Sequence, residues 1–444
     1  MTEPQTSLQR REAGVQHRQV TKRGALGAWQ APATRADPVD ILIAQGTSRI
    51  QELLPLRYGR MQVSAFAFLR GAAAVMAADL GSMPHSGLVV QACGDCHLAN
   101  FGAFRSPEGA PVFDINDFDE TLPAPFEWDL KRLATSLVVA GQDQHLTDRQ
   151  CGELARAAAA AYRTQMADLS GLSPLQAWSA RISLPDAIAS IQEPKLRARE
   201  AARLQAATTG SDTAYGLVER TADGWSLRAK PGIHRLEAHE LATKHVFDQY
   251  AESLPPERQV LFRRYTVRDV AFKAVGVGSV GTFCAIGLFT TGDGEPLLLQ
   301  LKEAGLSVLA SFAGSSVFTN QGQRVVVGQR IMQAVTDIFL GWTDAGVDNE
   351  RQFYVRQLKD PKLAAIGEGL TGSLVFYAPL CGRTLARAHA RSGDAALLSG
   401  YLGGGGAMDD AVVQFALSYA QQTRLDWQSM LAAIRAGRIS AATV

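Results

Sequence analysis

The chain has 444 residues, of which 46% are apolar and 20% charged, a composition typical of a folded protein with two lobes or domains. Its 44 basic and 43 acidic residues nearly balance, so charge predicts neither a nucleic acid nor a membrane surface as a partner. Five scattered cysteines, no run of about 18 apolar residues and no secretory signal predict a cytoplasmic protein, whose oligomeric state the sequence leaves open.

The first half of the chain has mainly helical patterns. Residues 1–36 are polar and rich in Arg and Gln, which predicts a flexible N-terminal arm. Helical apolar spacing then predicts helices over 37–61 (broken at Pro55), 64–80 and 126–142, with further helices up to 212. Between them, "SGLVVQACGD" and "APVFDINDFDE" each contain a short apolar strand. We expect 37–212 to form a helical lobe.

The pattern changes after residue 212. A β-hairpin is predicted over 213–229, a helix near 235–252 and a β-rich block over 265–302. A helix over 320–342 and a strand over 352–360 follow, and the remainder is helical. The sequence therefore predicts an α+β fold. A β-rich lobe over 213–360 is inserted between the first helical segment and a helical return over 361–444.

The stretch "ACGDCHLANFG" (92–102) contains C-x-x-C-H, a pattern that allows three interpretations. Covalent haem attachment needs export, for which the chain carries no signal. A zinc site or redox pair would use Cys93 and Cys96, but zinc needs two further ligands, and no other Cys or His has suitable spacing. We favour the interpretation that the two cysteines are small, partly buried residues flanking a functional loop.

The same stretch contains G-D-x-H-x-x-N, a pattern suited to phosphoryl transfer. Such transfer needs a carboxylate to accept the proton of the attacking hydroxyl, and hard oxygen ligands for Mg²⁺. Asp95 precedes Asn100 by five residues, and Asp117 follows the next predicted strand. A strand–loop–strand hairpin would bring the three to one end. They are candidates for the base (Asp95) and the metal ligands (Asn100, Asp117) of a site for ATP and Mg²⁺.

A glycine-rich loop lies in the β-rich block. Gly276, Gly278 and Gly281, with Ser279 between them, form G-x-G-x-x-G. A dinucleotide-binding loop would open a helix, but here the following residues continue as a strand, as in a kinase loop that covers phosphates. Lys302 lies about twenty residues further, where such a sheet would present a lysine to the α- and β-phosphates.

"GDCHLAN" followed by "DFDETLPAPFEWDLKRLATSL" is similar to the pattern of aminoglycoside phosphotransferases and choline kinases. That resemblance implies the same roles for Asp95, Asn100 and Asp117, a bracing role for Asp129 and a loop-shaping role for His97. Asp114 is a further supporting candidate. After residue 37, features such as "LRYGRM", "FDINDFDET" and "LQLKEA" also resemble a bacterial family of uncharacterised proteins, a domain of unknown function.

The order of the motifs departs from that of ordinary kinases. The catalytic loop precedes the glycine loop by about 180 residues, and "CGRTLARAHARSGD" (381–394) resembles the helix that normally leads into it. A circularly permuted, two-lobed protein kinase-like fold would explain this order. The helix over 320–342 offers no early Glu to pair with Lys302, which leaves Gln329 or Glu303 as partners.

From these features we expect an ATP- and Mg²⁺-dependent phosphotransferase that acts on a small hydroxylated molecule. Two alternatives remain open: a nucleotidyl (AMP) transferase on the same fold, and a catalytically silent kinase-like nucleotide-binding module. The missing Glu favours the silent module, whereas the intact set of Asp95, Asn100 and Asp117 argues against it.

Overall fold

The structure, a computed structural model, describes residues 5–208, 216–222, 224–228, 233–235, 243–273, 280–344, 351–358 and 361–443. The helices up to residue 208 are α1 (Ser7–His17), α2 (Pro38–Gly46), α3 (Leu54–Met61), α4 (Ala65–Gly71), α5 (Ala73–Gly81), α6 (Phe126–Asp143), α7 (Asp148–Ser170), α8 (Pro174–Ser179), α9 (Leu184–Ala189) and α10 (Pro194–Thr208). Later helices are α11 (Thr243–Ser253), α12 (Pro256–Phe262), α13 (Ala310–Ala313), α14 (Gln321–Met332), α15 (Pro361–Leu370), α16 (Leu374–Ala390), α17 (Ala395–Leu402) and α18 (Ala407–Arg435). Short 3-10 helices are η1 (Arg23–Gly27), η2 (Gln51–Leu53) and η3 (Leu98–Asn100).

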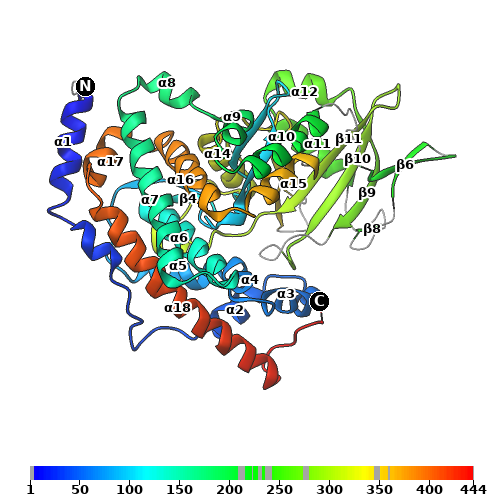
Figure 1. Cartoon of the computed structure of the whole chain (residues 1–444). Coiled ribbons are helices and arrows are strands. Elements are labelled where there is room, and N and C mark those ends of the chain that lie inside the picture. The colour runs from blue at the N-terminus through cyan, green and yellow to red at the C-terminus, as the bar shows by residue number, and fades with distance from the viewer. Residues whose placement is uncertain are drawn as a thin grey trace.

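The strands confirm the predicted α+β class. They are β1 (Val89–Ala92), β2 (Phe101–Arg105), β3 (Pro111–Ile115), β4 (Leu122–Pro125), β5 (Ile182–Ser183), β6 (Val218–Thr221), β7 (Gly224–Leu227), β8 (Ile233–Arg235), β9 (Thr266–Lys273), β10 (Cys284–Thr290), β11 (Pro296–Glu303), β12 (Gly341–Asp344) and β13 (Gln352–Gln357). The largest sheet has the order β12-β13-β11-β10-β9-β8, and its neighbouring strands are antiparallel. Figure 1 shows this sheet on one side of the molecule and α6, α7, α16 and α18 on the other.

Helix α14 packs against the large sheet at very close range. A side chain on Gly322 would place its Cβ 2.0 Å from the carbonyl oxygen of Phe353 in β13, so only glycine fits there. The sequence predicts a helix over 320–342, but α14 ends at Met332 and residues 341–344 form β12. Trp342 therefore lies in a strand, because pairing of β12 with β13 prevails over the local helical spacing.

The helical part is built around α6, which is buried along almost its whole length. It packs against α7 and α18, and α16 packs against α7. Two small sheets lie beside it: β1 pairs with β4 in one, and β3 pairs with both β2 and β5 in the other. The loop between β1 and β2 and the loop between β3 and β4 therefore both lie where the two small sheets meet, which is the place of the candidate site.

Both ends of the chain pack on this helical part. The N-terminal arm, predicted to be flexible, is helical over Ser7–His17, and α1 packs on α17. The contact is close because Gly400 lies where a Cβ would be 2.1 Å from the carbonyl oxygen of Arg11. Near the other end, the amide of Ala442 donates to the carbonyl of Pro55 at 2.8 Å. Small residues, and not an apolar stripe, make the contact between α1 and α17.

Among the described residues no single helix is long and apolar enough to cross a membrane. Helices α15 and α16 reach that length and composition only together, as a pair bent by 112°.

Candidate active site

A cavity of about 390 Å³ lies where the two loops of the small sheets face the end of the large sheet. Its lining includes Asp95, His97, Asn100, Asp117, Asp119 and Glu120. Four of these are residues predicted from the sequence, and the cavity brings them together. Of the glycine loop, Gly276, Gly278 and Ser279 lie outside the described residues. Gly281 is described and has a φ of +89°, next to the side chain of Arg49.

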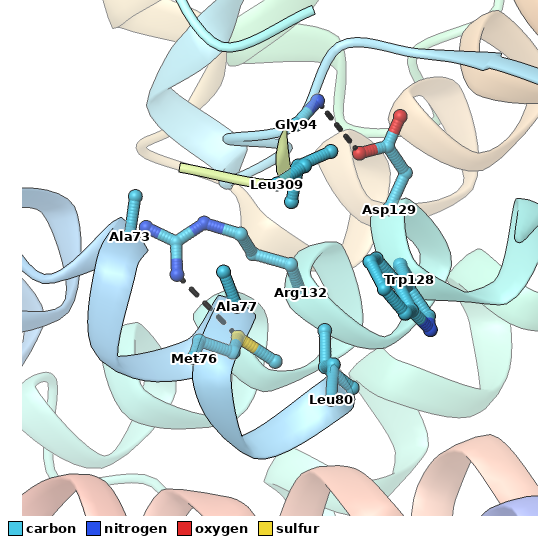
Figure 2. A pocket seen from close by; sticks show the side chains of 9 residues that line it. All are labelled: Ala73, Met76, Ala77, Leu80, Gly94, Trp128, Asp129, Arg132 and Leu309. Carbon is cyan, nitrogen blue, oxygen red and sulfur yellow. Dashed lines mark hydrogen bonds between the residues drawn. The ribbon is translucent and has the colours of Figure 1, made fainter. Parts of the chain in front are cut away.

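Asp129 of α6 holds the loop that carries Asp95. Its two carboxylate oxygens accept hydrogen bonds from the amides of Cys93 (2.7 Å) and Gly94 (3.0 Å). Figure 2 shows the bond to Gly94. His389 of α16 lies 3.2 Å from the same carboxylate through Nε2. Gly94 has a φ of +80°, a conformation that glycine adopts without strain. Helices α6 and α16 therefore hold the loop that carries Asp95 in position.

Arg132, one turn along α6, binds Asp95 itself. Its Nε donates to Oδ1 of Asp95 at 2.6 Å, and its Nη2 contacts the same oxygen. Another bond runs from Nη2 to the carbonyl of Leu69 at 2.9 Å. In Figure 2 the Arg132 side chain extends beside Ala73 and Met76. Oδ2 of Asp95 forms no hydrogen bond with any described residue, so one oxygen is anchored and the other remains for chemistry.

His97 and Asn100 complete this loop. His97 is buried, and its Nε2 lies 3.8 Å from Oδ2 of Asp95. Burial lowers the pKa of His97 to about 3, so the imidazole is neutral at physiological pH. Asn100 donates its Nδ2 to the backbone carbonyl of Asp95 at 2.7 Å. The amide orientation leaves its side-chain oxygen as a candidate metal ligand.

Lys302 of β11 reaches the acidic loop from the large sheet. Its Nζ lies 2.8 and 3.0 Å from the carboxylate oxygens of Asp119, and 3.8 Å from that of Asp117. Tyr354 also donates to Asp119, at 2.6 Å. Burial lowers the pKa of Lys302, but the charges of Asp117 and Asp119 outweigh it and leave the pKa well above its usual value. Lys302 is therefore a fixed cation at the cavity.

The partner of Lys302 differs from both residues suggested by the sequence. Gln329 donates to Gln333 at 2.9 Å, and Glu303 accepts from the amide of Phe283 at 2.8 Å. The helix α14 carries Arg324 on its first turn, which donates to the carbonyl of Asp119 at 2.9 Å. Asp119 was not among the candidate residues predicted from the sequence. Its position two residues after Asp117 is the sequence feature that could have indicated its role.

Asp114, a supporting candidate, lies away from the cavity. It is buried and forms an ion pair with Arg387 of α16. Its carboxylate also accepts from the amides of Ile115 (2.8 Å) and Ala334 (3.2 Å). Asp114 therefore joins β3 to α16, and it has a structural role.

Cys93 and Cys96 are buried free thiols. Their sulfurs and a carboxylate oxygen of Asp129 lie within 4.8 Å of one another, a grouping that could hold a metal. However, burial raises the pKa of Cys93 well above its usual value and that of Cys96 to about 11, which keeps both thiols protonated. Since Asp129 already accepts two backbone bonds, we assign the cysteines to packing beneath the loop.

Glu120 gives the cavity a group that titrates near neutrality. Its Oε2 accepts from the amide of Val308 at 2.7 Å. Burial raises the pKa of Glu120 to about 7, against the opposing effect of that hydrogen bond and of Arg324. The folded state therefore keeps this proton to a higher pH than the unfolded chain does. The free energy of unfolding therefore falls as pH rises from the pKa of an ordinary glutamate toward 7. Above about pH 7 it stays at this lower value.

We expect Glu120→Gln to remove this cost. Near pH 8 the variant should have a free energy of unfolding about 1 to 3 kcal/mol higher than the wild type, and near pH 4 the two should be equal. Urea unfolding at both pH values measures the difference. A difference that does not change with pH would contradict the assigned pKa.

Comparison with protein families gives one match. A family described as "Uncharacterized protein conserved in bacteria (DUF2252)" matches residues 49–433. A comparison with curated proteins returned no match, and a comparison with solved structures returned none either. The match covers the loops of Asp95 and Asp117, the strand of Lys302 and the helices that support them.

Proposed function

The chain belongs to this conserved bacterial family, and we propose that it is an ATP- and Mg²⁺-dependent phosphotransferase that acts on a small hydroxylated acceptor. The observation that carries the proposal is the convergence of Asp95, Asn100 and Asp117 on one cavity, with Lys302 at its edge. A carboxylate, a second carboxylate with an amide, and a lysine are the groups that phosphoryl transfer requires.

Each residue has a role that its contacts support. Asp117 and Asn100 offer the hard oxygen ligands that suit Mg²⁺, which would neutralise charge on the phosphates. Lys302, held by Asp119, would bind the α- and β-phosphates. Gly276 to Gly281 are proposed to cover them. Asp119 and Tyr354 take the place of the glutamate that usually orients such a lysine.

The proposed reaction is an in-line displacement at the γ-phosphorus. The acceptor oxygen forms a bond to phosphorus, the bond from phosphorus to the β,γ-bridging oxygen breaks, and ADP leaves with that electron pair. Oδ2 of Asp95 receives the proton of the acceptor hydroxyl. Arg132, through Oδ1, keeps the carboxylate in position for this transfer and is a positioning residue.

A kinase-like two-lobed fold with permuted order is part of the proposal. The sheet that carries Lys302, with α14 packed on it, would be the nucleotide lobe. Helix α16 lies under the Asp95 loop, where Tyr377 donates to the carbonyls of Leu98 (3.1 Å) and Phe101 (3.0 Å). This is the position expected of the helix that precedes the loop in ordinary kinases. The packing of both chain ends on the helical part supports the permutation.

Isothermal titration with ATP, with Mg²⁺ or with EDTA, tests the proposal. We expect wild-type protein to bind ATP at least about tenfold more tightly with Mg²⁺, and Asp117→Ala and Lys302→Ala to lose this binding. Cys93→Ser and Cys96→Ser are controls that should keep the affinity within about twofold. Absence of Mg²⁺-dependent ATP binding in the wild type, or full binding by Asp117→Ala, would overturn the proposal. Product labelled from the γ-phosphate of ATP supports phosphoryl transfer, and product labelled from the α-phosphate supports the nucleotidyl alternative.

A further inference from the structure

Two arginines from the N-terminal helical segments, Arg49 and Arg70, line the cavity. Arg49, between α2 and η2, donates Nη1 to the carbonyl of Val280 at 2.6 Å, next to the glycine loop. Burial lowers the pKa of Arg49, and the charges of Glu120 and Asp119 oppose that shift. Arg49 therefore lies beside the end of the glycine loop, next to Val280 and Gly281.

Arg70, in the last turn of α4, lines the same cavity as Asp95 and Asp117. Burial lowers the pKa of Arg70, and the charges of Asp95 and Asp117 oppose that shift. Its guanidinium forms no hydrogen bond with any described residue, and its Nε is buried without a partner. The guanidinium lies 6.0 Å from the ring centroid of Phe66. A permanently charged group with unfilled donors thus lines the cavity beside the proposed base.

The two acids near Arg70 already have other cations beside them. Asp95 is paired with Arg132, and Lys302 lies 3.8 Å from Asp117. Arg70 is therefore not needed to neutralise the base, and a cationic acceptor would leave its charge uncompensated in a partly buried site. The nearby His97 is neutral, so it adds no competing charge.

We propose that the acceptor is a small hydroxylated anion, with a carboxylate or phosphate group close to the reacting hydroxyl, and that Arg70 binds that anionic group. This inference rests on the proposed phosphotransferase function, in which the nucleotide binds in the same cavity. Guanidinium binds both carboxylate and phosphate oxygens through paired N–H donors, so Arg70 serves either chemistry.

The test uses full-length protein saturated with Mg²⁺ and a non-hydrolysable ATP analogue, so that the phosphate positions of the nucleotide are filled. Sulfate and acetate are then titrated separately, and binding is followed by calorimetry. We expect wild-type protein to bind at least one of them about tenfold more tightly than Arg70→Gln does. Arg70→Lys, which keeps the charge, should restore part of the affinity. Arg149→Gln, which removes an exposed arginine from α7, should bind like the wild type.

The outcomes separate the two proposals. Tighter sulfate binding indicates a tetrahedral anion such as a phosphate ester, and tighter acetate binding indicates a carboxylate. Equal affinity in wild type and Arg70→Gln, or no anion binding to the nucleotide complex, would overturn the role of Arg70 while leaving the phosphotransferase proposal in place. Failure of the wild type to bind the Mg²⁺-nucleotide would instead overturn the proposed function, and the inference with it.

Discussion

Asp95→Asn should lower the Mg²⁺-dependent release of phosphate from γ-labelled ATP by about 10²- to 10⁴-fold. The asparagine side chain keeps the size of the aspartate but cannot take up a proton from the attacking hydroxyl or water. Because Asp95 is not expected to hold the phosphates, the affinity for Mg²⁺-ATP should stay within about threefold of the wild type. The loss should therefore appear in turnover and not in nucleotide binding.

Asp168→Asn is a matched control, since Asp168 is exposed on α7 and away from the cavity. It should leave both turnover and affinity unchanged. Rapid-quench measurement of labelled phosphate gives the turnover, and calorimetry gives the affinity. Unchanged turnover in Asp95→Asn would show that the base lies elsewhere. An equal loss of nucleotide affinity would mean that Asp95 binds the metal instead.

The residues of the site that could be predicted are those that lie close to one another in the sequence. Asp95 and Asn100 lie in one short loop, where spacing alone places them together. The pairing of Asp119 with Lys302 joins residues 183 positions apart, and it depends on how the large sheet meets the acidic loop. The anchoring of Asp95 by Arg132 likewise depends on the direction of α6 under the loop. Local periodicity predicts neither the orientation of the large sheet against the acidic loop nor the direction of α6.

The fold likewise has elements that the local sequence pattern predicts and strand pairings that it does not. The helix predicted over 126–142 and the strands predicted within 265–302 correspond to α6 and to β9, β10 and β11, because long apolar patterns of one period dominate there. The partner of each strand was harder to predict from the sequence. A single hairpin around the Asp95 loop was predicted, whereas β1 pairs with β4 and β2 with β3. Pairing is decided by burial on both faces of each strand, which a single sequence does not display.

Arg387→Met should be the most destabilising of the substitutions considered, by about 3 to 5 kcal/mol at neutral pH. The Arg387 side chain is 1% exposed and its partner Asp114 is 3% exposed. Arg387 also donates to the carbonyl of Met332 at 3.0 Å, so it links α16 to the end of α14 as well as to β3. Removing the cation leaves the carboxylate of Asp114 buried with two backbone donors among the described residues, Ile115 and Ala334.

The pH dependence distinguishes this cause from a simple loss of packing. Burial raises the pKa of Asp114, and Arg387 opposes that rise. Without Arg387 the folded-state pKa lies higher still, above its value in the unfolded chain. The cost should therefore be small near pH 4, where the carboxyl can be protonated, and should grow as pH rises toward neutrality.

Urea unfolding of Arg387→Met, Asp114→Asn and the double variant near pH 4 and near pH 7 completes the test. The double variant should be more stable near pH 7 than Arg387→Met alone, because the uncompensated charge is gone. A loss from Arg387→Met that is equal at both pH values, with no recovery in the double variant, would mean that packing of the long side chain, and not the charge of Asp114, holds β3 against α16.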